Sequence, residues 1–128
     1  MTTEVSAAVE EIRGAFPQSV VIAQDDGSGG AYVTVEAMSL GDLYVQADSW
    51  IGFRITFQYP CADIYPHFVR SDLARKDGRP LGDGMGGGHV FLGRPAVQIS
   101  RRSNRLNPAT DTALLKLLKV LEWLRTHP

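Results

Sequence analysis

The side chains that could form a covalent bond to a substrate are a thiol and two hydroxyls. Cys61 is the single cysteine of the chain, and Ser100 and Ser103 lie in one arginine-rich stretch. A thiolate or an activated hydroxyl can attack the carbonyl carbon of an acyl group, provided that a base or a cation lies beside it. Acyl transfer is therefore the chemistry to test for these three residues.

Their sequence neighbours give these nucleophiles little support. Cys61 is followed by Ala62 and Asp63, and a nearby carboxylate disfavours the thiolate form. We expect a buried and inert cysteine, the usual state of a free thiol in a folded domain. No convincing base accompanies Ser100 or Ser103, so an oxyester on either serine stays a weaker alternative.

His89 is the histidine that is best placed to act as a general base or a metal ligand. It follows Gly86, Gly87 and Gly88, where the backbone can approach a partner closely because glycine has no side chain. The three histidines of the chain are scattered without metal-ligand spacing, so we expect no metal site. Residues 82–87 spell GxGxxG, but no helix pattern follows, so we expect no dinucleotide cofactor either.

Four arginines form the clearest candidate binding surface. Arg94, Arg101, Arg102 and Arg105 cluster in one segment, and arginine recognises carboxylates and phosphates well. A solvated surface without a ligand is the alternative. The net charge of −1 and the lack of interleaved aromatic residues do not indicate nucleic acid. These arginines could contact an acidic patch on a partner or a phosphate.

Two helices are predicted to enclose the segment that carries these residues. Val5, Val9, Ile12 and Phe16 recur at the spacing of one helical face, and a proline follows. For the second helix, Asn107 is the predicted cap. Its predicted apolar stripe comprises Leu114, Leu117, Leu118, Leu121 and Leu124, with Lys116, Lys119 and Glu122 facing outward.

The middle of the chain predicts an antiparallel sheet. Four segments have β-branched or alternating apolar character, namely residues 19–23, 31–37, 50–59 and 64–69. Residues 71–88 are polar and glycine-rich and predict a long surface loop, followed by an irregular apolar stretch over residues 89–99. We therefore expect one α+β domain over residues 1–128, in which a four-stranded antiparallel meander is packed against an N-terminal and a C-terminal helix.

Two segments of the chain resemble the ubiquitin-conjugating-enzyme superfamily, which includes inactive variants and RWD domains. Residues 53–70, FRITFQYPCADIYPHFVR, resemble the third strand of the family and its Tyr-Pro motif. Residues 89–100 (HVFLGRPAVQIS) and 104–124 (NRLNPATDTALLKLLKVLEWL) resemble the stretch from the active site to the last helix in bacterial conjugating-enzyme-like proteins. The resemblance covers nearly the whole chain and depends on the order and spacing of these motifs.

The chain departs from the family at the catalytic position. The family's cysteine falls on Val97, give or take one residue, and its His-Pro-Asn motif is reduced to His89-Val90-Phe91. The resemblance implies a structural role for His89, holding the loop backbone by hydrogen bonds. It also implies that the protein lacks the thioester step, since valine cannot carry an acyl group.

Three functions follow as expectations. The first is a non-catalytic adaptor, a pseudoenzyme that binds a ubiquitin-like protein or an activating-enzyme-like protein. For this function the resemblance implies three contact surfaces: the glycine-rich loop 82–88 with Gly86, Gly87 and Gly88, the cluster of Arg94, Arg101, Arg102 and Arg105, and the first helix. The second is an atypical conjugating enzyme with a displaced nucleophile, Cys61 or a serine, and the third is an unrelated small α+β binding domain. The single cysteine and the absence of a long apolar run predict a cytoplasmic protein without a membrane segment.

Overall fold

A helix near each end of the chain packs its apolar face onto one sheet. In the computed structural model, which describes residues 1–127, α1 spans Thr3–Ala15 and α2 spans Ala113–Thr126. The side chain of Thr2 caps α1 by accepting a hydrogen bond from the backbone nitrogen of Val5. Val5, Val9 and Ile12 are buried, which confirms the predicted face of this helix.

Among residues 1–127 the sheet has six strands, so the predicted number of four is wrong. Its strands run in the spatial order β1-β2-β3-β4-β6-β5, with every neighbouring pair antiparallel. The first four strands form the predicted meander, and β5 and β6 add a hairpin beyond β4. The strand bounds are β1 Val21–Asp25, β2 Ala31–Ser39, β3 Asp48–Ile55, β4 His67–Arg70, β5 Met85–Phe91 and β6 Arg94–Ile99.

The additional hairpin comes from segments that have weak strand signals. β5 begins at Met85, inside the predicted loop 71–88, and contains three successive glycines, which strands usually avoid. β6 contains Pro95 and pairs with β4, so that Val97 lies opposite Val69. Long-range pairing with an existing sheet edge therefore overrides the local preference of both segments.

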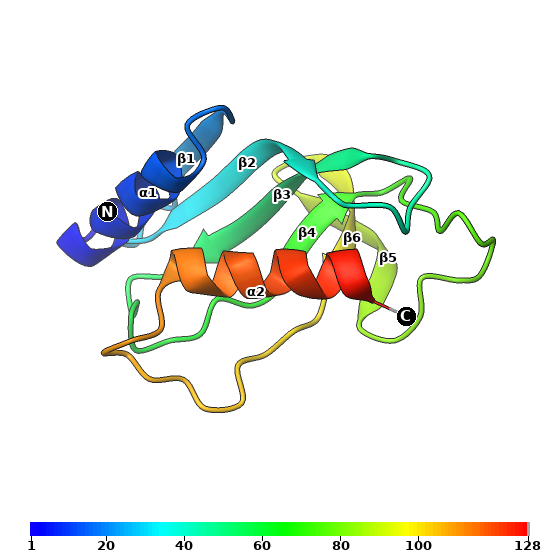
Figure 1. The fold of residues 1–128 in the computed structure, drawn as a ribbon. Coiled ribbons are helices and arrows are strands. Elements are labelled where there is room, and N and C mark those ends of the chain that lie inside the picture. The colour runs from blue at the N-terminus through cyan, green and yellow to red at the C-terminus, as the bar shows by residue number, and fades with distance from the viewer. Residues whose placement is uncertain (128) are drawn as a thin grey trace.

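Both helices lie on the same face of the sheet (Figure 1), where α1 also contacts α2. The main core fills the space between them and the sheet. It is closed by apolar side chains from all of these elements, among them Val9, Ile12, Val33, Phe53, Val69, Val97, Ile99, Leu117, Leu121 and Leu124.

The opposite face of the sheet carries a second, smaller aromatic cluster. Phe91 of β5 lies over Gly52 of β3 and stacks at ring-centroid distances of 6.0 Å from Trp50 and 5.3 Å from Phe68. Both faces of β3 are therefore largely buried, although alternation of apolar and polar residues over 50–59 is typical of a strand with one solvated face, and that expectation is wrong. β3 also ends at Ile55, short of the predicted end at residue 59.

The start of α2 differs from the prediction by about a turn and a half. Thr112 caps it by accepting a hydrogen bond from the nitrogen of Leu115, whereas the side chain of Asn107 caps a separate turn by accepting from the nitrogen of Ala109. The buried face of α2 also differs from the predicted stripe. Leu118 is 42% exposed, Val120 takes a place in the core, and Lys116 is partly buried and does not face outward.

Among residues 1–127, neither helix has the length and apolar character needed to cross a lipid bilayer.

Candidate functional site

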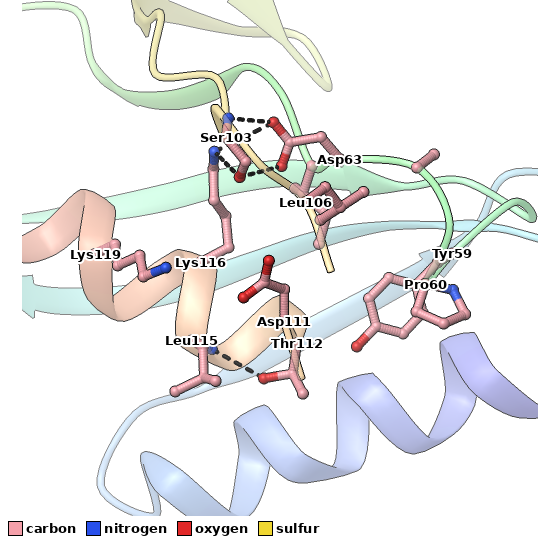
Figure 2. Close-up of a pocket in the computed structure, with 12 residues that line it drawn as sticks. Tyr59, Pro60, Asp63, Ser103, Leu106, Asp111, Thr112, Leu115, Lys116 and Lys119 are labelled. Carbon is pink, nitrogen blue, oxygen red and sulfur yellow. Dashed lines mark hydrogen bonds and ion pairs between the residues drawn. The ribbon is translucent and has the colours of Figure 1, made fainter. Parts of the chain in front are cut away.

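A polar bridge connects three segments that are far apart in the sequence. Asp63 follows β3, Ser103 follows β6, and Lys116 lies on the second turn of α2 (Figure 2). The nitrogen of Ser103 donates to Asp63 Oδ2 at 2.7 Å, and its hydroxyl donates to Asp63 Oδ1 at 2.8 Å. Lys116 Nζ lies 3.3 Å from Asp63 Oδ2 and 3.0 Å from Ser103 Oγ. We call these three residues the polar bridge.

Burial and pairing oppose one another at Asp63 and Lys116. Burial acts to raise the pKa of Asp63, but the hydrogen bonds from Ser103 and the charge of Lys116 outweigh it and hold that pKa below its usual value. At Lys116, burial is the stronger influence and lowers the pKa, and the ion pair with Asp63 offsets only part of this change.

His67 of β4 lies near this bridge in the core. It is fully buried, and neither ring nitrogen has a hydrogen-bond partner among residues 1–127. The pKa of His67 is lowered to about 3, chiefly by burial and to a lesser extent by the positive charge of Lys116, while Asp63 opposes the change. The imidazole is therefore neutral at physiological pH and cannot donate a proton to a ligand.

The polar bridge is better suited to holding two segments of the chain together than to nucleophilic attack. A serine nucleophile needs a base that takes its proton, and Lys116 is within reach of Ser103. However, the Ser103 hydroxyl donates to Asp63, and Asp63 also pairs with Lys116 and so favours its charged form. The bridge therefore holds the segment that follows β6 against α2.

The segment that the bridge holds forms one wall of a basic groove, and α2 forms the other. The groove has a volume of about 320 Å³. We define the basic groove by its side chains Arg101, Arg102, Asn104, Arg105, Lys119 and Trp123, with Ser103, Asp111, Lys116 and Val120 completing its lining.

The cations of the basic groove are available to a ligand. Among residues 1–127, Arg101, Arg102, Arg105 and Lys119 form no ion pair with a carboxylate, and all four are exposed. Aromatic rings orient two of the guanidinium groups: Arg101 lies 4.9 Å from the centre of the Trp123 ring, and Arg102 lies 3.9 Å from that of Tyr65.

A small notch adjoins the basic groove. Its volume is about 20 Å³, and its apolar walls come from Tyr59, Pro60, Ile64, Leu106 and Leu115, with part of the lining shared with the groove (Figure 2). A charged trough thus continues, at the start of α2, into a recess whose lining is half apolar and half polar.

Three of the four predicted arginines meet in this groove, and Arg94 lies elsewhere. Arg94 pairs with Glu36 at 2.8 Å and lies over the ring of Trp50 at 4.6 Å, on the sheet face away from the helices. Gly86, Gly87 and Gly88 are exposed within β5. They do not line the basic groove.

The candidate nucleophiles and base do not come together. Cys61 is exposed, so the prediction of a buried thiol is wrong. Among residues 1–127, no lysine, arginine or histidine side chain forms a hydrogen bond with its sulfur. His89 is exposed in β5, 6.4 Å from Phe68 between ring centres. Its ring makes no hydrogen bond within the described part of the chain, contrary to the structural role that the resemblance implied. Ser100 is exposed and accepts a hydrogen bond from Gln98.

Val97 lies in the main core. It is 2% exposed and pairs with Val69 in the middle of the sheet. A side chain in this place cannot reach a partner, whatever its chemical type, because the helices cover this face of the sheet.

Sequence reasoning missed Asp63, Lys116, Lys119 and Trp123 as parts of one site. A weak signal was present, since Lys116, Lys119 and Trp123 follow the i, i+3, i+7 spacing of one helical face. Only the fold places that face opposite the arginines. Among residues 1–127, no group of histidine, cysteine and acidic side chains is arranged to hold a metal ion.

Comparisons with known proteins identify no relative, so the proposed function is argued from the geometry described above. No protein-family model matches the chain, and no match was found among curated proteins or among solved structures.

Proposed function

We propose that the protein is a non-catalytic, ubiquitin-conjugating-enzyme-like binding module that acts as an adaptor for a ubiquitin-like protein or its conjugation machinery. The observation that carries the non-catalytic part is the burial of Val97, the residue at the position of the family's cysteine. An acyl carrier must expose its nucleophile to a large protein partner, and this side chain packs inside the core.

The binding part of the proposal is supported by the basic groove. Arginines that are separated from α2 in the sequence face Lys119 across one trough, without ion pairs among residues 1–127 to neutralise them. Charge arranged in this way favours recognition of an oppositely charged partner. The order of helix, antiparallel sheet and helix agrees with the resemblance at the level of the α+β class.

The test is a reconstituted conjugation assay. The protein is mixed with ATP, an activating enzyme and a ubiquitin-like protein, and covalent adducts are followed on non-reducing gels while binding is measured by titration calorimetry. We expect saturable binding to either protein and no adduct. A reducer-sensitive adduct that is lost in Cys61→Ala would overturn the non-catalytic part, and no binding to either protein would overturn the adaptor function.

A second candidate, an atypical conjugating enzyme, is favoured by the approach of Ser103 Oγ to Lys116 Nζ, at 3.0 Å. In this function the serine oxygen attacks the thioester carbonyl, its proton passes to a neighbouring base and the thiolate leaves. The product is an oxyester that resists reducing agents and is cleaved by hydroxide. Such an adduct, lost in Ser103→Ala and kept in Ser100→Ala, would favour this function over the adaptor.

A further inference from the structure

The spacing of charges in the basic groove fits an extended chain. Its α2 wall runs from Lys116 to Trp123, a rise of roughly 10 Å. About three residues of an extended peptide cover that length. Arg101 lies over Trp123 at one end, while Lys116 and its bridge to Asp63 lie at the other.

Apolar surface lies beside these charges. The ring of Trp123 is partly buried beneath Arg101 at one end of the groove, and Leu106 and Leu115 line the notch that adjoins it. Leu115 is 44% exposed, whereas Val120 of the groove lining is only 1% exposed and belongs to the core. The carboxylate of the groove lining, that of Asp111, accepts a hydrogen bond from the nitrogen of Asn107.

We infer that the basic groove binds an extended acidic segment of a protein partner, with carboxylates on the cations and one apolar side chain packed against the exposed Leu115 at the mouth of the notch. This inference rests on the proposed binding function and names the partner's chemistry. A site for a compact phosphate group would gather its cations around a single point. Here the cations are spread along the trough, and the exposed Leu115 adjoins it, a pattern that matches a segment with several acidic residues and an apolar one.

The probe is a fluorescein-labelled peptide of sequence Asp-Glu-Leu-Asp-Glu-Phe, read by fluorescence anisotropy at low and high salt. A second peptide has serine in place of leucine and phenylalanine, and inorganic triphosphate serves as a competitor. We expect saturable binding of the first peptide, weaker binding of the serine peptide, and loss of affinity as salt rises. Triphosphate is expected to compete poorly.

Charge reversal maps the site. The double variant Arg101→Glu with Lys119→Glu should weaken binding of the first peptide about tenfold, because it replaces attraction with repulsion. Lys76→Glu, an exposed lysine outside the groove lining, is the matched control and should bind as the native protein does. Leu115→Ser should weaken binding of the first peptide and leave the affinity for the serine peptide unchanged. Thermal unfolding of every variant checks that the fold is kept.

Four outcomes would overturn the inference: no binding of the first peptide, equal binding of the two peptides, displacement by triphosphate at equimolar concentration, or unchanged affinity in the double variant. The assay contains no ubiquitin-like protein and no activating enzyme. Its failure would leave the adaptor function standing, whereas the adaptor function fails only in the conjugation assay.

Discussion

At the scale of single residues, Asp63 organises the site. Its two carboxylate oxygens accept three hydrogen bonds, two from Ser103 and one from Lys116. The side chain is only 21% exposed, and that of Lys116 is 10% exposed. Loss of the carboxylate would leave a partly buried ammonium and a backbone nitrogen without their acceptor, which is costly.

We predict that Asp63→Asn lowers the free energy of unfolding by about 1–3 kcal/mol at pH 7. The folded pKa of Asp63 is below its usual value, so this contribution is present above the unfolded pKa of about 4 and is lost as the pH falls through the lower, folded pKa. Urea unfolding at pH 7 and at pH 3 measures the change. The gap between variant and native protein should narrow at pH 3.

Asp42→Asn is the matched control, since Asp42 is exposed and makes no side-chain hydrogen bond or ion pair among residues 1–127. Its effect should stay within about 0.5 kcal/mol. An Asp63→Asn protein as stable as the native one at pH 7 would contradict the role given to the polar bridge.

His67 is the second residue whose substitution should change the stability of the protein measurably. We predict that His67→Leu raises the free energy of unfolding by about 1 kcal/mol at pH 7, because two unpaired buried nitrogens are removed. The folded pKa is about 3 and lies below the ordinary value of 6.5. The unfolded state therefore binds more protons between these values, and the native protein loses roughly 1.4 kcal/mol for each pH unit below about 6.5.

The stability gap between His67→Leu and the native protein should therefore widen to about 3 kcal/mol at pH 5. Denaturant unfolding at pH 7, 6 and 5 gives the slope directly. A gap that stays constant with pH would show that His67 does not titrate in this way. His89→Leu, at an exposed position, should change the stability at pH 7 by less than about 0.5 kcal/mol.

At the scale of elements, the β5–β6 hairpin is anchored by one aromatic ring. Phe91 covers Gly52, and a β-carbon added at position 52 would collide with its ring. The glycine thus permits the hairpin to close over the open face of β3. This contact, together with the stacking on Trp50 and Phe68, is the reason that a glycine-rich segment holds a place in the sheet.

We predict that Gly52→Ala lowers the free energy of unfolding by about 1–3 kcal/mol, since it overpacks this contact. The same substitution should cost less in a Phe91→Ala background, and a double-mutant cycle by urea unfolding measures the difference. Gly87→Ala is the matched control, because no atom lies within 4 Å of its added β-carbon. An equal loss of unfolding free energy from Gly52→Ala in the two backgrounds would contradict a contact between Gly52 and Phe91.

At the scale of the whole molecule, α2 is fastened at both ends by tyrosines from distant loops. The hydroxyl of Tyr59 accepts a hydrogen bond at 3.0 Å from the nitrogen of Ala113, at the start of the helix. The hydroxyl of Tyr44 donates at 2.9 Å to the carbonyl of Leu124, near the end of the helix. These links set the position of α2, and hence the width of the basic groove.

We predict that Tyr44→Phe and Tyr59→Phe each lower the free energy of unfolding by about 1 kcal/mol, the usual net contribution of one hydrogen bond. Tyr44→Phe should have the larger effect, because its hydroxyl bond is buried. Chemical denaturation provides the measurement. Tyr65→Phe is the control, since the Tyr65 hydroxyl has no hydrogen-bond partner within residues 1–127, and a loss as large as for Tyr44→Phe would contradict the argument.

Local patterns were enough to predict the α+β class, α1 and the meander of β1 to β4. Val5, Val9 and Ile12 mark their buried face by spacing alone, and alternation marks β2 and β3. The start of α2 was predicted too early, because Asn107 and Thr112 are both good caps and local preference does not choose between them. Tertiary contacts, including the bond from Ala113 to Tyr59, favour Thr112.

The amino-acid sequence alone specified which residues are apolar and periodic, and which cations cluster along the chain. It also determined that valine stands where the resemblance places a cysteine. Those properties depend on residue type and near neighbours only.

Tertiary structure alone decided that Arg101, Arg102 and Arg105 face Lys119 while Arg94 does not, and that Asp63 joins Ser103 to Lys116. It also decided that a glycine-rich segment becomes β5. The physical reason is that these arrangements are energetically favourable only after distant segments have met, and short-range preference carries no information about which segments will meet.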